Sequence, residues 1–282
     1  MLWSVHFTDK INFKSIFRSD EKVIKRIKEI YAYRTMIYSL VKRDLKGRYK
    51  GSVLGFLWTF INPLFQLLIY TFVFSIVLHS DVKDYYMFLF VALIPWIFFS
   101  TSLAGGSTCI TSQKNMVQKI YFPREVLPIS FVTSQFVNML LSFIVIFAVM
   151  IIARYKFNPL ALLCLIPVML TEYILALGFT FILSAVTVYF QDMQFIMGIL
   201  TMAWQFLSPI MYSQERVPVE FRAIYMYVNP MAPIIIAYRD ILYYGRVPEL
   251  ATLLSALLMG ILLFVIGWFT FDRMQRHFVE EM

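Results

Sequence analysis

The sequence predicts an all-α integral membrane protein with six transmembrane helices. Of its 282 residues, 60% are hydrophobic and only 15% are charged, and the mean hydropathy is +0.71. A soluble domain with a solvated surface does not have this composition. A helix needs about 20 apolar residues to cross the hydrocarbon core of a bilayer. Five runs of that length occur at residues 53–78, 86–110, 127–153, 160–189 and 250–271, and a shorter sixth run, 195–212, ends at Ser208-Pro209.

The first 50 residues form a separate polar region before the transmembrane domain at 51–282. Ser19 can cap a first short helix, and a second helix is expected from about Tyr33. In the second helix, apolar residues recur at every fourth position and basic residues occupy the other sides. The apolar positions are Ile37, Val41, Leu45 and Tyr49, and the basic ones are Lys42, Arg43, Lys46 and Lys50. This pattern is typical of an amphipathic helix in the headgroup layer; a solvated basic helix before the first span is the alternative.

The distribution of basic residues predicts the orientation in the membrane. Thirteen of the 25 Lys and Arg residues precede position 51, and cytoplasmic flanks carry the excess of positive charge. The N-terminus is therefore expected in the cytoplasm and, with six spans, so is the C-terminus; Arg154 and Lys156 in an outer loop disagree mildly. The first 50 residues carry a net charge of +8, equal to that of the whole chain. Anionic lipid headgroups are thus the expected partner, not nucleic acid.

The cytoplasmic loop at residues 113–128 is predicted to dock another component. It is too short to form a domain and too apolar for a solvated turn. Its apolar residues include Met116, Val117, Ile120, Tyr121 and Phe122. A surface-lying helix that only stabilises its own subunit is the alternative.

Residues 213–249 cannot cross the bilayer as one helix, because they contain four basic and four acidic residues. Two short helices are predicted at 219–228 and 234–244, separated by Asn229-Pro230 and Pro233 and ended near Gly245, since proline breaks helices and favours turns. This segment is expected to form a re-entrant hairpin at the outer face, between the fifth and sixth spans.

No catalytic or metal site is predicted. The three histidines are scattered, and no nucleophile and base can be paired. Cys109 and Cys164 lie in apolar spans and are expected to be packing residues. Glu172 is the one acidic residue near the middle of a span, where a hydrogen-bonded structural carboxyl is the favoured interpretation over a proton relay. Gly51 and Gly55 form a GxxxG, which permits close approach of helices.

Aromatic residues make up 18% of the chain, and a few are candidates for lining a conduit. Contact with lipid or with the protein core is the alternative for each. The candidates by position are Trp58, Phe60, Phe65, Tyr70, Trp204 and Phe206.

Several segments together resemble the membrane subunits of ABC exporters for lipid-linked polysaccharides, which include O-antigen, capsule and teichoic acid exporters. The segments are LVKRDLKGRYKGSVLGFLWTFINP at 40–63, QKNMVQKIYFPREVLP at 113–128, and the blocks SPIMYS, NPMAPI and YRDILYYG in residues 208–245. In order, they cover nearly the whole chain, although each one alone is a weak signal.

The resemblance implies a bacterial cytoplasmic (inner) membrane permease that transports a polyprenyl-pyrophosphate-linked glycan outward. The sequence contains no GxxxxGK[ST] phosphate-binding loop, so ATP and Mg²⁺ are expected on a separate ATPase subunit. Six helices form a small conduit, which favours a homodimer carrying two ATPase subunits. The implied phosphate contacts are Arg43, Arg48 and Lys50. The residues implied to receive the ATPase stroke are Asn115, Lys119, Tyr121, Phe122, Pro123 and Arg124. Those implied in the outer hairpin are Pro209, Tyr212, Asn229, Pro230, Arg239 and Asp240.

Three other functions are alternatives. An ABC exporter of a small molecule or drug is the closest, because no residue specifies a sugar. An ion-coupled secondary transporter normally has several ionisable groups in the membrane, whereas only Glu172 is apparent. A membrane enzyme acting on lipid-linked sugars would require clustered acids, histidines or a metal site.

Overall fold

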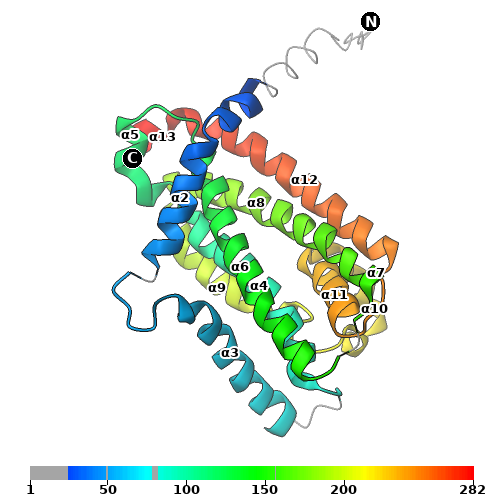
Figure 1. The fold of residues 1–282 in the computed structure, drawn as a ribbon. Coiled ribbons are helices and arrows are strands. Elements are labelled where there is room, and N and C mark those ends of the chain that lie inside the picture. Colours follow the sequence, from blue (N-terminus) through cyan, green and yellow to red (C-terminus); the bar gives the residue numbers. More distant parts are fainter. Residues whose placement is uncertain (1–24, 49, 78–81, 156) are drawn as a thin grey trace, which may run out of the picture.

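A computed structural model of the protein describes residues 25–48, 50–77, 82–155 and 157–282; the predicted Ser19 cap lies outside these ranges. Within them, all regular structure is helical (Figure 1). The helices are α2 (Arg34–Gly47), α3 (Trp58–Thr71), α4 (Tyr85–Ser107), α5 (Lys114–Lys119), α6 (Val126–Ile152), α7 (Pro159–Leu163), α8 (Leu165–Tyr189), α9 (Met193–Leu207), α10 (Val219–Val228), α11 (Met231–Leu242), α12 (Leu250–Met274) and α13 (Phe278–Glu281).

Five helical segments are long and apolar enough to cross a membrane, so the chain is a multi-pass membrane protein. They are Trp58–Ser75, Tyr85–Ser107, Val126–Ile152, Pro159–Tyr189 and Leu250–His277. The sixth predicted span corresponds to α9, which is apolar but has only 15 residues. Six spans therefore remain a prediction, in which α9 would supply the sixth.

Helix α4 is the centre of the bundle. It packs against α3, α6, α8, α9 and α11, and 78% of its apolar window is buried. Apolar residues surround the helix on all sides, as expected for a helix enclosed by other helices. The spans α3 and α12 are only 17% buried by the rest of the chain, so their outer faces are available to lipid or to a partner.

The closest contact between two spans is made by α8 and α12. A Cβ atom added to Gly178 would lie 2.6 Å from the backbone nitrogen of Phe264, and one added to Gly267 would overlap the backbone of Gly178. Gly178 and Gly267 thus allow the close approach of two helices that the sequence suggested for Gly51 and Gly55. That suggestion is wrong: Gly51 and Gly55 lie in the turn before α3 with φ angles of +83° and +47°, and nothing lies within 4 Å of an added Cβ.

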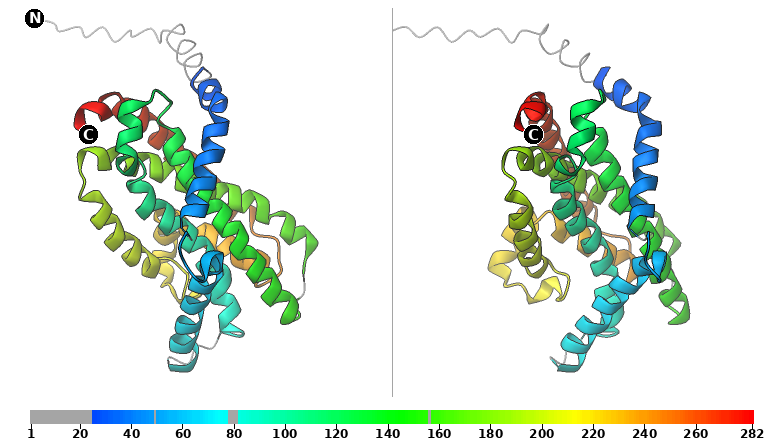
Figure 2. Two further views of the ribbon diagram at one scale, coloured as in Figure 1. Left: turned by 60° about the vertical axis from the view of Figure 1, so that its left-hand side comes forward. Right: turned by 90° about the vertical axis from the view of Figure 1, so that its left-hand side faces the viewer.

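Helix α2 lies across the bundle and not along it. In Figure 1 it runs across the direction of α6, α8 and α12, and it packs against α6. Leu40 is its one buried residue, while Asp44 accepts a hydrogen bond from the Ser134 hydroxyl of α6. The helix begins one residue after the predicted start, and its place in the headgroup layer stays a prediction. Figure 2 shows that α5, α13 and the C-terminus lie at the same end of the molecule as the beginning of α2.

The hairpin helices α10 and α11 lie at the opposite end of the bundle (Figure 1). Helix α10 has the predicted bounds, but α11 begins at Met231, three residues earlier than expected. The prediction that Pro233 separates the two hairpin helices is wrong. Pro233 is in the first turn of α11, where a backbone N–H would have no helical acceptor and the proline ring is tolerated. All twelve residues of α11 are buried, so this helix of the hairpin is part of the core, whereas α10 exposes Val219, Phe221, Tyr227 and Val228.

Three loops are tied together by side chains at that end. The Tyr155 hydroxyl is 3.0 Å from Asp84 Oδ2, and the Asn158 side chain donates to the carbonyl of Gly245 at 3.0 Å. The Tyr243 hydroxyl donates to the carbonyl of Lys83. The α3–α4 loop, the α6–α7 loop and the segment after α11 are thereby connected.

Candidate functional site

The loop at residues 113–128 folds into a short helix followed by an extended segment. Helix α5 follows a single 3-10 turn, Thr111–Gln113, and Ile120 leaves the helix in an extended conformation. Two neighbouring aromatic residues of the loop differ in exposure: Tyr121 is 84% exposed, whereas Phe122 is 5% exposed. Tyr121 and Ile120 therefore face outward, and Phe122 and Val117 hold the loop on the bundle.

The other residues implied in this loop divide in the same way. Asn115 and Lys119 are exposed, Pro123 is buried and Arg124 is half-buried. A partner that docks here would contact the exposed group directly. It would affect Phe122 and Pro123 only through the position of the backbone.

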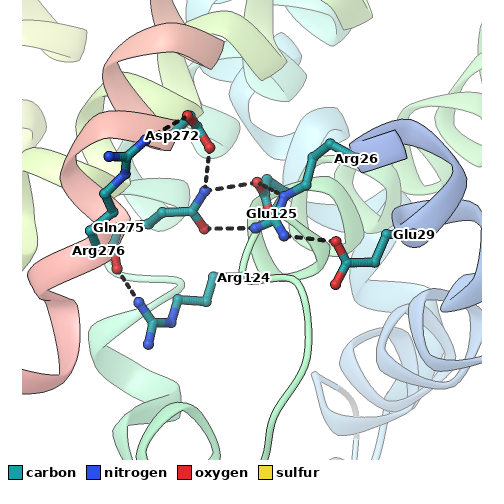
Figure 3. A network of polar contacts seen from close by, with 7 residues as sticks. All are labelled: Arg26, Glu29, Arg124, Glu125, Asp272, Gln275 and Arg276. Carbon is teal, nitrogen blue, oxygen red and sulfur yellow. Dashed lines mark hydrogen bonds and ion pairs between the residues drawn. The ribbon is translucent and has the colours of Figure 1, made fainter. Parts of the chain in front are cut away.

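Glu125, directly before α6, is the centre of a polar network that joins three parts of the chain (Figure 3). Its carboxylate is 1% exposed and accepts from Arg26 Nε at 2.8 Å and Arg26 Nη2 at 2.9 Å. It also accepts from Gln275 Nε2 at 2.9 Å. Arg26 belongs to the N-terminal helical segment and Gln275 follows α12, so the network connects the loop to both. Each oxygen of a buried carboxylate requires such partners.

Two further contacts extend the network. Arg26 Nη1 donates to Glu29 at 2.9 Å, and the Arg124 guanidinium donates to the backbone carbonyl of Gln275. Burial lowers the pKa of Arg26. Its hydrogen bonds with Glu125 and Glu29, and the attraction of their negative charges, outweigh burial, so that the pKa is raised overall. Burial also lowers the pKa of Arg124; attraction by Glu125 opposes this shift and repulsion by Arg26 adds to it. Both guanidiniums stay charged at neutral pH.

An open cleft of about 640 Å³ lies beside the network. Its apolar wall includes Trp268 and Phe269 of α12, and its charged wall includes the three arginines of the network. The lining residues are Arg26, Val117, Ile120, Tyr121, Phe122, Arg124, Trp268, Phe269, Asp272, Gln275 and Arg276. A surface with apolar walls and a basic rim suits a protein partner that presents an aromatic or aliphatic side chain with acidic neighbours.

The three implied phosphate contacts do not converge on one point. Arg43 lines a cavity of about 240 Å³ between α2 and the ends of α4 and α6. Arg48 pairs with Asp44 at 3.0 Å, with about 30% of each side chain exposed, and lines a different cavity. Lys50 is exposed beyond the end of α2. These residues form a basic edge along the interface helix instead of a single pocket.

The aromatic candidates fall into two groups. Trp58 and Phe65 are 37% and 59% exposed and line a cleft beside α3, Phe206 is 58% exposed, and Phe60 is half-buried. The other two are held by specific contacts. Tyr70 accepts from Gln205 at 3.2 Å. Trp204 packs edge-on against Phe99 and Phe179 and donates to Asn229 at 3.0 Å.

The hairpin candidates do come together, around Arg239 of α11. Its guanidinium donates to the carbonyls of Ile210 at 2.6 Å and Tyr212 at 3.1 Å, and more weakly to that of Phe88 at 3.3 Å. It also lies 3.5 Å from the centre of the Phe88 ring, a cation–π contact. Arg239 therefore anchors both the segment after α9, which contains Pro209, and the start of α4.

Asn229 and Asp240 complete the hairpin. Asn229 donates to the Leu207 carbonyl and the Ser208 hydroxyl, each at 3.0 Å, and accepts from the backbone nitrogen of Met231 at 3.1 Å. It thus caps α11 by way of its side chain, next to the buried Pro230. Asp240 pairs with Arg246 at 2.7 Å.

Residues 35–243, from α2 to the end of α11, match the ABC-2 type transporter family. The chain belongs to this family. It is 34% identical over 264 residues to the O-antigen export system permease protein RfbA of Myxococcus xanthus, covering 92% of this chain and 100% of that protein. It is 30% identical over 248 residues to RfbA of Klebsiella pneumoniae, covering 87% and 94%. It is 24% identical over 219 residues to the polysialic acid transport protein KpsM of Escherichia coli, covering 76% and 83%.

Glu172 has a structural setting in this ABC-2 family member. It is fully buried on α8, and its Oε2 accepts from the Tyr238 hydroxyl of α11 at 2.6 Å. Its Oε1 has no hydrogen-bond partner among the residues that the structure describes. The contact is that of a hydrogen-bonded carboxyl between two helices, as expected from the sequence. In the described ranges, no group of three or more His, Cys, Asp and Glu side chains is placed to hold a metal ion.

Sequence reasoning missed the network residues Arg26, Glu125 and Gln275. Arg26 is one of thirteen basic residues before position 51, and Glu125 is one charge within the loop at residues 113–128. The one available signal was the position of Glu125 directly before an apolar run of 27 residues, where a charge at the bilayer edge requires a partner. That partner is 99 residues away, which no local pattern indicates.

Proposed function

We propose that this chain is the transmembrane subunit of an ATP-driven exporter that moves a polyprenyl-pyrophosphate-linked polysaccharide from the cytoplasm to the outer face of the bacterial cytoplasmic membrane. Family membership supports the transporter class. Polysaccharide cargo is supported by the two named groups of relatives, O-antigen export and polysialic acid transport permeases, which match most of this chain and most of their own lengths. The cargo is proposed to be O-antigen, capsule or teichoic acid in type.

The functional unit is a homodimer with two ATPase subunits, which bind the ATP and Mg²⁺. The chain itself has no GxxxxGK[ST] loop, and the poorly buried α3 leaves a long face for a second copy. In this arrangement α9 supplies the sixth span, both termini lie in the cytoplasm, and the α10–α11 hairpin lies at the outer face. The basic edge with Arg43, Arg48 and Lys50 contacts anionic lipid and the phosphates of the carrier.

The proposal rests on Tyr121, whose side chain faces outward beside the cleft next to Glu125. The ATPase docks on this surface. Because Glu125 is bonded to both Arg26 and Gln275, a displacement of the loop is passed at once to the N-terminal helices and to α12. A loop that served only its own subunit would bury its aromatic residues instead of exposing one at 84%.

Co-purification tests the proposal directly. A tagged chain extracted from native membranes in mild detergent is expected to bring down a P-loop ATPase at two copies per two chains. Tyr121→Glu is expected to lose the ATPase, whereas Tyr227→Glu, a similarly exposed tyrosine (71%) at the opposite end of the bundle, is expected to retain it.

Two results contradict the proposal. Retention of the ATPase by Tyr121→Glu refutes the docking surface, and a stable complex without any ATPase refutes the exporter assignment. If the ATPase co-purifies with the chain but deletion of the chain leaves the surface glycan unchanged, the result favours a small-molecule cargo.

A further inference from the structure

An open groove of about 720 Å³ lies between α2 and α6. Its apolar walls are formed by Ile37, Val41 and Leu45 of α2 and Val137 of α6. The three α2 residues are spaced by four and therefore share one face of the helix. The cavity lined by Arg43 lies on another side of α2, so the groove is separate from it. The volume is within the range of about 300–1,000 Å³ that is usual for ligand sites.

The α6 wall of the groove belongs to a membrane-spanning helix. Thr133 and Val137 follow Val126, the first residue of α6, by 7 and 11 residues. At 1.5 Å per residue they lie about 10–17 Å along the span. The Thr133 hydroxyl already donates to the Ile129 carbonyl at 2.6 Å and is 2.8 Å from the Tyr173 hydroxyl. The wall therefore suits a hydrocarbon chain and not a water-soluble ligand.

The rim of the groove is basic. Arg34, Lys42 and Lys46 belong to the lining, and none of the nine lining residues is acidic. In the part of the chain that the structure describes, no ion pair includes any of these three residues. Asp44, the one acidic residue of α2, is bonded to side chains outside the groove. Three positive charges beside an apolar groove favour an anionic partner.

Two of the basic groups lie over tyrosine rings. The guanidinium carbon of Arg34 is 4.9 Å from the centre of the Tyr31 ring, and the Lys42 ammonium is 5.9 Å from that of Tyr38. Both rings are exposed, at 67% and 66%. A cation–π contact attracts a cation but leaves its charge in place. Tyrosine is enriched where the membrane meets water, so the rim suits a headgroup and the groove suits its chain.

We propose that this groove binds one anionic glycerophospholipid of the inner leaflet, with an acyl chain between α2 and α6 and its phosphate beside Lys42 and Lys46. The lipid would join the crosswise helix α2 to a span. A second copy docked here by twofold symmetry would bring the same positive charges together, so charge favours the lipid. The inference rests on the membrane placement of α2 in the proposed function, but not on the cargo.

Native mass spectrometry of the full-length chain tests the charge of the ligand. The delipidated chain is expected to bind one phosphatidylglycerol in preference to phosphatidylcholine. Lys42→Gln/Lys46→Gln should weaken this binding by roughly 30-fold, from the attraction typical of two basic residues near anionic lipid. The control Lys25→Gln/Lys28→Gln removes two exposed lysines outside the lining and should bind as the wild type does.

Three results of this measurement overturn the proposal. They are equal binding of the two phospholipids, an equal loss in both double variants, and retention from native membranes of a polyprenyl phosphate instead of a phospholipid.

Photolabelling tests the position of the acyl chain. A phosphatidylglycerol that carries a diazirine in its acyl chain is expected to label α2 within residues 37–45. Val137→Trp should fill the groove and abolish this labelling, whereas Ile144→Trp should retain it, because Ile144 is 59% exposed on α6 outside the lining. Unchanged labelling in Val137→Trp overturns the proposal. Absence of labelling in the wild type also overturns it and indicates that another part of the chain or a second copy covers the groove.

The two proposals fail differently. If deletion of the chain leaves the surface polysaccharide unchanged, the proposed function is wrong, whatever the purified chain binds. If export depends on the chain but phosphatidylglycerol is neither preferred nor found in the groove, only the lipid site is wrong.

Discussion

Breaking the Glu125–Arg26 pair should destabilise the protein measurably, and the size of the effect follows from the burial of the two groups. Glu125→Ala leaves the Arg26 guanidinium and the Gln275 amide without their shared partner. Removing one member of a buried pair costs about 3–5 kcal/mol. The lower end, about 3 kcal/mol, applies here because Arg26 is 26% exposed and keeps Glu29 at 2.9 Å.

The assay is thermal unfolding of the purified chain in detergent, at one fixed scan rate because such unfolding is irreversible. With a shift of about 2–4 °C per kcal/mol for a chain of this order of size, Glu125→Ala should lower the apparent Tm by about 6–12 °C. Arg26→Ala should have a similar effect. The double variant should lose little more than either single variant, because the two residues share one interaction.

The control is Arg276→Ala in the same region. Arg276 is 73% exposed and lies 3.9 Å from Asp272, and exposed pairs contribute about 0–1 kcal/mol. At the same conversion, Tm should change by less than about 4 °C. Additive losses in the Arg26→Ala/Glu125→Ala variant, or an equal loss in Arg276→Ala, would refute the reasoning.

Three other predictions concern separate parts of the chain. Gly267→Val should destabilise the protein by about 3 kcal/mol or more, since a Cβ there meets backbone that cannot move aside. Gly198→Val, where nothing lies within 4 Å of an added Cβ, should leave Tm unchanged. Equal Tm values for the two variants would contradict the α8–α12 contact. Arg239→Met leaves three buried carbonyls without their donor, at about 1–3 kcal/mol each, and should speed hydrogen exchange in the segment after α9 but not in α2; unaltered exchange there would count against the anchor. Arg48→Gln should weaken export with under about 1 kcal/mol of lost stability, because its pair with Asp44 is exposed; full export would remove Arg48 from the phosphate contacts.

The spans were predictable because hydrocarbon thickness fixes the length of an apolar helix. Residues 127–153 were expected and α6 is Val126–Ile152, and residues 160–189 were expected where the helical segment is Pro159–Tyr189. The first span was predicted to begin at 53, but α3 begins at Trp58. Hydropathy counts Gly51 and Gly55 as neutral, whereas their positive φ angles form a turn.

The tertiary polar contacts could not be predicted. Arg26 and Gln275 are separated by 249 residues, and both contact Glu125. Arg239 was implied only as a residue of the outer hairpin, and its burial (3% exposed) and bonds to backbone carbonyls are not indicated by the sequence. Such pairings depend on how helices pack, which one sequence does not specify.

The loop contacts near Gly245 and the contacts of Arg239 differ in how firmly they hold this end of the molecule. The contacts of Tyr155, Asn158 and Tyr243 are made at the edge of the bundle, where water competes for the same groups, so each contributes only about 1 kcal/mol. The three together therefore hold this rim by only a few kcal/mol. Arg239 is shielded from water and bonded to backbone carbonyls. The rim near Gly245 is thus the less firmly held part of this end, and the Arg239 anchor is the firmer one.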